Sequence, residues 1–142
     1  MNTLIRLADA VTSHLNGGAF SLPLQAVRRY QPVFELPDLQ ELQVSVVPKS
    51  IAVLAGDRST QVFEAVVDVG IQKQVDPEAL AELDALLALV GEVLDALRGQ
   101  RLPEFPEAAW VGITNEPVFA PEHLQQKRVF TSVVSVTYRL RR

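Results

Sequence analysis

The strongest constraint on the fold is the alternation of apolar and polar side chains over residues 61–73. Apolar residues occupy every second position from Phe63 to Ile71, whereas Glu64 and Asp68 fall between them. This alternation is typical of a strand in a sheet that buries one face and leaves the other open. A shift of one residue would bury both carboxylates, so we expect a firmly set strand register.

A long amphipathic helix follows this strand. Asp76 suits the N-cap, Pro77 the first helical position, and Gly99 the end of the helix. The expected apolar stripe consists of Leu80, Leu83, Leu87, Val90, Leu94 and Leu97, widened by Leu86 and Val93. Such a helix between strands is expected to pack on a sheet, with a self-pairing coiled coil as the alternative.

The remaining elements follow from shorter patterns. The spacing of Leu4, Leu7, Val11 and Leu15 predicts a first helix, which Asn2 caps and Gly17 and Gly18 end. Further strands are expected over residues 25–34, 42–48, 109–114 and 128–142, the second of them ending at Pro48. Residues 49–60 fit either a hairpin extension or a long loop.

The order helix, three strands, helix, two strands predicts an α+β fold. We expect a mixed, mostly antiparallel sheet of about four to five strands with two helices packed on one face. A doubly wound fold would need regular alternation of strands and helices, which this sequence lacks. The 142 residues fit a single domain spanning 1–142, without internal repeats or linkers.

Composition excludes several classes of protein. The absence of cysteine removes disulfides, thiolate zinc sites, iron–sulfur clusters and cysteine nucleophiles. A net charge of −4 argues against general affinity for nucleic acid. No apolar run reaches the ~18–20 residues that span a bilayer, and the start of the chain lacks a signal-peptide pattern. We therefore expect a chain that folds in the cytoplasm and does not enter a membrane.

A search for catalytic motifs gives no candidate. The seven glycines are scattered, so no phosphate-binding loop is present. His14 and His123 are far apart and lack ligand-like neighbours, and no serine stands in a nucleophile elbow. Glu64 and Asp68 share a strand face as a general acid–base pair would, although a solvated or subunit-facing position is expected. The sequence therefore predicts no catalytic, cofactor or metal site, and a protein that is not an enzyme.

Charged residues provide candidates for a contact surface. Arg28 and Arg29 should point to opposite faces of their strand, and Arg58 lies in a turn, where contact residues are common. The candidate subunit-contact or lumen residues are Arg28, Arg29, Arg58, Glu64, Asp68 and Arg139. The segment 77–98 carries five acidic residues against Arg98, whereas the last sixteen residues are basic without an acid. The two could pair within one subunit or between neighbours, or simply be solvated.

Several short phrases resemble a known family. Residues 39–48 (LQELQVSVVP), 57–59 (DRS) and 67–73 (VDVGIQK), then the long acidic helix and residues 130–138 (FTSVVSVTY), occur in this order. Together they resemble the small tail-terminator or neck proteins of long-tailed bacteriophages and prophages. The resemblance covers nearly the whole chain, as a pattern of elements and short phrases without a catalytic signature.

The resemblance implies a subunit of a ring, expected to be a homohexamer, in the virion tail. Such a ring caps the tail tube, ends its polymerisation and joins tail to head, so the implied partners are further copies, the tail tube protein and head-connector proteins. DNA would pass through the ring without specific binding, and no cofactor is implied. The alternatives are a head-completion or neck ring, and a small binding module unrelated to phage.

Overall fold

The computed structural model describes residues 2–31, 36–54, 56–57 and 60–141. Its elements in chain order are α1 (Thr3–Asn16), β1 (Ala26–Arg28), η1 (Leu36–Gln40), β2 (Gln43–Leu54), β3 (Val62–Gln74), α2 (Leu80–Leu97), β4 (Ala109–Asn115), η2 (His123–Lys127) and β5 (Val129–Arg141). The two long helices and the strands follow the predicted order.

The strands form one mixed sheet in the order β1-β2-β3-β5-β4. The pairs β2–β3, β3–β5 and β5–β4 are antiparallel, and only β1 pairs parallel, with β2. The long central pair runs from Val62 opposite Arg141 to Gln74 opposite Val129 without a register shift. The α+β class with a mostly antiparallel sheet is therefore confirmed.

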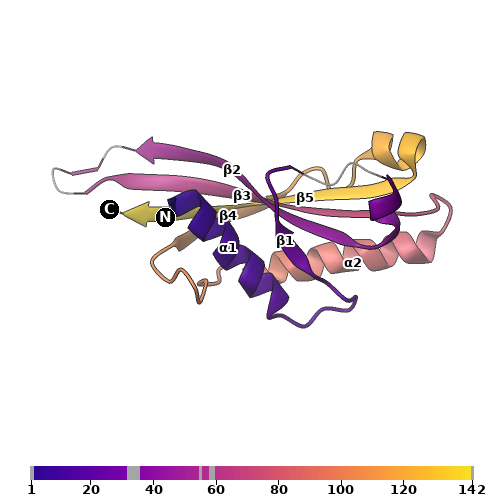
Figure 1. The fold of residues 1–142 in the computed structure, drawn as a ribbon, viewed down its shortest axis with the longest axis horizontal. Helices are drawn as coiled ribbons and strands as arrows, with labels where there is room; N and C mark the ends of the chain where they lie inside the picture. Colours follow the sequence, from indigo (N-terminus) through magenta and orange to yellow (C-terminus); the bar gives the residue numbers. More distant parts are fainter. Residues whose placement is uncertain (1, 32–35, 55, 58–59, 142) are drawn as a thin grey trace.

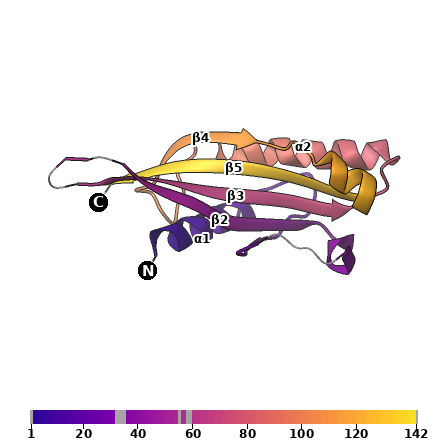
Figure 2. The same cartoon turned by 90° about the horizontal axis from the view of Figure 1, so that it is seen from above.

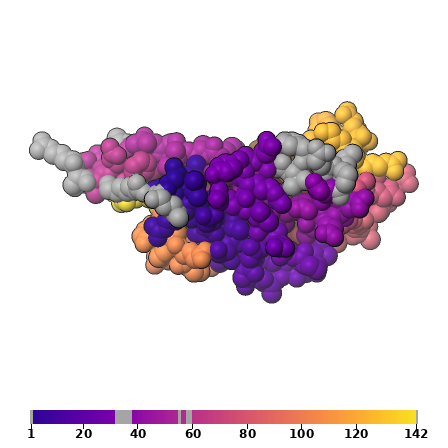
Figure 3. Space-filling view, viewed as in Figure 1, coloured from indigo at the N-terminus to yellow at the C-terminus, as the bar shows by residue number. Residues whose placement is uncertain are grey.

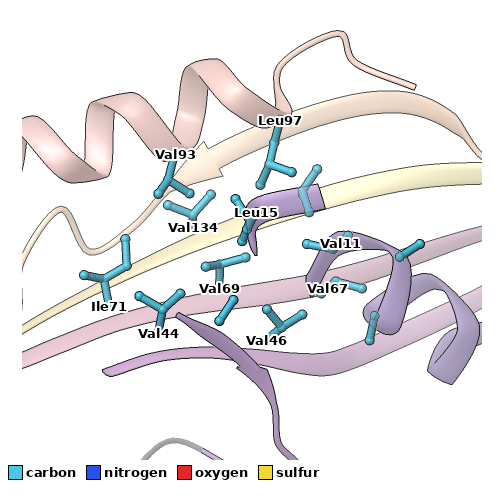
Figure 4. Packing of buried hydrophobic residues seen from close by; sticks show 14 of the residues in the cluster. Val11, Leu15, Val44, Val46, Val67, Val69, Ile71, Val93, Leu97 and Val134 are labelled. Carbon is cyan, nitrogen blue, oxygen red and sulfur yellow. The ribbon is translucent and has the colours of Figure 1, made fainter. Parts of the chain in front are cut away.

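Both long helices cover one face of this sheet (Figure 1). Seen from above, α1 lies on the β2 side and α2 on the β4 side (Figure 2). A single apolar core fills the space between these layers (Figure 4). It joins Val11 and Leu15 of α1 and Val93 of α2 to strand residues such as Val69 and Val134.

Local sequence explains how α1 begins. The Asn2 side-chain Oδ1 accepts hydrogen bonds from the backbone N–H of Leu4 at 2.8 Å and of Ile5 at 3.2 Å. These bonds satisfy two of the donors that a helix start leaves without an intrahelical partner. The predicted cap is confirmed, and the apolar stripe of α1 is buried against the sheet.

The predicted start and apolar face of α2 need correction. The helix begins at Leu80, and Asp76 instead caps a preceding turn by accepting from the backbone N–H of Glu78 at 3.0 Å. Leu80 is 68% exposed. The fully buried face consists of Leu86, Leu89, Val90, Val93 and Leu97. Leucines on several sides of α2 allowed more than one stripe, and packing on the sheet selected this one. Gly99 follows the helix at φ 66°, as its predicted role requires.

Two predicted strands have different limits. β1 covers only Ala26–Arg28, because the chain leaves β2 soon after Arg29 donates its N–H to the Val46 carbonyl at 2.9 Å. Residues 32–35 lie outside the described residues. β2 does not end at Pro48 but continues to Leu54, with a register shift between Pro48 and Ser50. This part of β2 pairs with β3 on one side only, so a residue without an N–H is tolerated.

The continuation of β2 forms a projecting arm, which we define as residues 49–54 of β2 and 62–65 of β3. Residues Ile51, Val53 and Leu54 pair here with Ala65, Phe63 and Val62. The arm extends past both long helices (Figures 1 and 2). The part of the segment 49–60 that the structure describes is thus mainly a hairpin extension, one of the two interpretations open from the sequence.

Candidate functional site

The candidate site is the sheet face opposite the helices, called here the open face, together with the arm. Arg28 and Arg29 mark the two faces at the β1 edge, as predicted. The Arg28 Nε donates to Asp9 Oδ1 of α1 at 2.6 Å, and its guanidinium lies 5.5 Å from the Tyr30 ring centroid. Hydrogen bonding with Tyr30 and then with Asp9 raises the pKa of Arg28 above its ordinary value.

Arg29 points to the open face. Its guanidinium donates to Ser45 Oγ at 2.7 Å and to Gln43 Oε1 at 3.1 Å, both on β2. Ser45 is fully buried, so Arg29 helps to cover this end of the open face. These bonds give Arg29 a role in holding β1 and β2 together.

Glu64 and Arg139 form an ion pair across two strands. They are register partners on β3 and β5, and Arg139 Nη2 lies 2.6 Å and Nε 3.1 Å from Glu64 Oε2. The Arg139 side chain remains about half exposed, so the pair faces solvent or a partner. An exposed pair of this kind contributes only ~0–1 kcal/mol to the free energy of unfolding.

Asp68 lies on the same face, with its own contacts. Its Oδ1 accepts from Ser135 Oγ on β5 at 2.5 Å, and its Oδ2 lies 3.9 Å from Lys49 Nζ on β2. Glu64 and Asp68 are four residues apart on one strand, which corresponds to ~13 Å. Because each carboxylate contacts a different partner at that separation, this arrangement does not bring them together for acid–base chemistry.

Arg58, the remaining candidate, lies outside the described residues. The adjoining arm carries a feature that the sequence reasoning did not assign to contact. Ile51, Val53 and Leu54 are 44%, 62% and 40% exposed. The apolar run at residues 51–54 was the available signal, but only the tertiary structure places it beyond the cover of the helices (Figure 3).

In the described residues no ion pair joins the acidic side chains of α2 to the basic chain end. Glu82 pairs with Lys73 at 2.6 Å, Asp95 contacts Arg98 at 3.5 Å, and Arg139 pairs with Glu64. The end of β5 lies on the arm side, whereas α2 begins at the opposite end of the molecule (Figure 1). Pairing of α2 with Arg139 or Arg141 would therefore require a second copy, whereas Arg128 lies near the start of α2, where its carbonyl accepts from the Val75 N–H at 2.8 Å.

The described residues contain no group of three or more His, Cys, Asp or Glu side chains that could hold a metal ion. Each histidine ring has a structural contact: His14 Nε2 lies 2.8 Å from the Ala96 carbonyl of α2, and His123 Nδ1 lies 3.0 Å from Thr131 Oγ1. An open pocket of ≈ 660 Å³ is lined by residues 22–25, 40–42 and Lys73. The Lys73 ammonium donates a hydrogen bond to Glu82 Oε1 at 2.6 Å.

Comparison with protein-family models finds no match for this chain. Comparison with curated protein sequences also finds none. Within the described part of the chain, no helix is long and apolar enough to cross a membrane.

Proposed function

We propose that this protein is a structural component of the tail of a long-tailed bacteriophage or prophage. In this proposal identical subunits form a ring, six by the family resemblance, that caps the tail tube, ends its polymerisation and joins tail to head. The chain acts through its surfaces and not as an enzyme.

The observation that carries the proposal is the arm. It places apolar side chains at Ile51, Val53 and Leu54 in solvent, beyond the core that the two helices cover. Exposed apolar surface of this kind marks protein–protein contact sites. A contact between two different patches of identical subunits closes into a ring when the rotation fits. The arm thus suits the ring assembly that the resemblance implies.

The open face supports the same proposal. Its acidic Glu64 is paired with the basic Arg139, and Asp68 accepts from Ser135 with Lys49 nearby. A surface whose charges are already paired presents little net field to a polyanion. If this face lines the ring, DNA passes without being held.

A small binding module is the second candidate, favoured by the open pocket near Lys73. Its walls combine the apolar Leu22, Leu24 and Leu42 with the polar Gln25 and Glu41. Ligand sites commonly combine apolar walls with a few polar groups. Such a module would remain monomeric or dimeric.

The test is the mass of the purified protein by light scattering over a wide concentration range, with electron microscopy of any large species. A six-fold ring with an open centre supports the proposal. A strict monomer contradicts ring assembly by the protein alone, and a tail function then requires that added tail tubes recruit the protein to their ends. Binding to head connectors without binding to tube ends would instead identify a head-completion or neck ring.

A further inference from the structure

The sheet has two edges that no strand covers in the described residues. At one margin β1 pairs only with Val44, Ser45 and Val46, so residues 49–54 of β2 have a partner strand on the β3 side alone. At the other margin β4 pairs with β5 and with no second strand. Unpaired strand edges present backbone donors and acceptors to any extended chain that approaches.

Both edges lack charged residues along most of their length, although a register shift interrupts β4 between Trp110 and Gly112 and β2 between Pro48 and Ser50. Residues 50–54 and 109–115 contain no charged side chain. Further protective residues lie at the base of the arm, as Pro48 and Lys49, and directly after β4, as Glu116 and Pro117. Ile51, Val53 and Leu54 on one edge and Val111 on the other are instead exposed apolar residues. Monomeric proteins shield long edges with charges, prolines, bulges or covering elements, so two edges with exposed apolar residues and uncharged stretches favour a partner.

The two edges are similar in length, opposite in direction and overlapping in level. The free part of β2 has about six residues, and β4 has seven. Three successive antiparallel pairings separate the two strands, so β2 and β4 run in opposite directions. The register continues across the sheet from Ala52 to Glu64, Arg139 and Ala109. Ala52 and Ala109 therefore lie at the same level on opposite margins.

We infer that the arm edge of β2 pairs antiparallel with the β4 edge of a second copy, which continues the sheet from subunit to subunit. A rotation about an axis running roughly along the strands brings the edges together with matching faces. The contact is heterologous, so each subunit uses both edges and the series can close. This inference rests on the proposed function, since it assigns the contact that builds the ring.

The cysteine-free sequence permits a direct test by disulfide crosslinking of Ala52→Cys/Ala109→Cys. Within one molecule the two positions are three strand spacings apart, ~14 Å, whereas a disulfide requires Cα atoms within ~7 Å. Any bond between them therefore joins two copies. Mild oxidation should give a ladder on a non-reducing gel that ends at the copy number of the ring. Reduction should collapse the ladder to monomer.

A face control separates strand pairing from simple proximity. Val53→Cys/Ala109→Cys uses the next residue along the arm, whose side chain points to the opposite face. We expect its ladder to be at least ~10-fold weaker, because side chains across a strand pair meet only on a common face. Ser50→Cys and Leu54→Cys, each combined with Ala109→Cys, cover a stagger of two residues on the same face as Ala52. A ladder at one of these three same-face positions supports the inference.

Two results overturn the inference. One is equal crosslinking from Val53→Cys and from the same-face positions. The other is the absence of crosslinking at all three same-face positions in samples that still form rings by light scattering, which would leave the proposed function intact. Conversely, a same-face ladder in a protein that binds neither tube ends nor head connectors supports the edge pairing and contradicts the proposed function.

Discussion

At the scale of single residues, two buried donors stand out. The Tyr138 hydroxyl and the Trp110 indole Nε1 are buried without a hydrogen-bond partner among the described residues. The two residues are register partners on β5 and β4 and point into the core. A buried polar group without a partner costs ~1–3 kcal/mol. The apolar packing of these two side chains stabilises the core, and the cost of their buried polar atoms partly offsets that gain.

Burial raises the pKa of Tyr138 well above its ordinary value of 10.0. The unfolded chain can ionise this phenol near pH 10 while the folded chain resists ionisation, so the folded state loses stability as the pH rises above ~10. We predict that Tyr138→Phe is neutral or stabilising by up to ~1 kcal/mol at pH 8 and loses less stability at pH 11 than the unsubstituted protein. Urea unfolding at both pH values measures this.

The control for this substitution is Tyr30→Phe, at the other tyrosine of the chain, which is 73% exposed. It removes a hydroxyl outside the core and should not stabilise the protein at pH 8, because no buried polar group is removed. An identical alkaline loss of stability in Tyr138→Phe and the unsubstituted protein would contradict the assignment.

The Asn2 cap of α1 gives a second prediction at this scale. Asn2→Ala removes the acceptor of two backbone N–H groups and should lower the free energy of unfolding by ~1 kcal/mol. Asn2→Asp keeps an acceptor oxygen and adds a negative charge at the helix start, so it should retain the stability. Thermal unfolding of the two variants distinguishes a cap from an ordinary terminal residue, for which both changes would be neutral.

At the scale of elements, α2 illustrates how packing selects one face of a helix. Leucines and valines stand on several sides of it, and the sheet buries the side that contains Leu89 and Val93. Leu83, Leu87 and Leu94 border the core and remain partly exposed. Because these leucines are only partly buried, we expect substitutions on the outer side of α2 to change the free energy of unfolding less than substitutions on the buried face.

Leu89 and Leu80 form a matched pair for testing the α2 face. We predict that Leu89→Ala lowers the free energy of unfolding by ~2–5 kcal/mol, since Leu89 is fully buried. Leu80→Ala, at an exposed position, should change it by less than ~0.5 kcal/mol. Chemical denaturation followed by circular dichroism measures both. A loss in Leu80→Ala as large as that in Leu89→Ala would contradict the buried face described above.

At the scale of the whole molecule, the covered core and the arm have different roles. Two helices and one sheet face bury the apolar side chains of the body, whereas residues 51–54 of the arm extend the sheet without such cover. Ile51 and Val53 continue the core-facing side of β2 into solvent. The core does not include these side chains, so they are available for the association proposed above.

Val53→Asp tests that division. The side chain is 62% exposed, so we predict a change of less than ~0.5 kcal/mol in the unfolding of the monomer. Self-association should weaken at least ~10-fold, because a carboxylate would be buried in the contact. Light scattering at matched concentrations measures the loss. Leu80→Asp, at the other end of the molecule, is the control, and equal weakening by both variants would contradict an arm-specific contact.

Much of the fold could be predicted because its signals are local. The alternation of β5 from Phe130 to Leu140 and the Asn2 cap depend on residues close together in the chain. Pairings between distant residues could not be predicted. Glu64 meets Arg139 only because β3 and β5 align 75 positions apart in sequence. The candidate residues were therefore identified as charged positions, but their partners were not.

The sequence by itself determined the order of the elements and the core-facing residues of the central strands, because the period of apolar residues is a property of each segment alone. Only the structure showed that both faces are buried around Gln72 and Thr131. Only the tertiary structure decided that β2 passes Pro48, which face of α2 is buried, and which strand edges remain unpaired. Each of these three features depends on which strand or helix packs beside the segment, and that contact joins residues far apart in the sequence. Pro48 permits a strand where its outer side has no partner, and the arm is exposed because both helices lie elsewhere on the sheet.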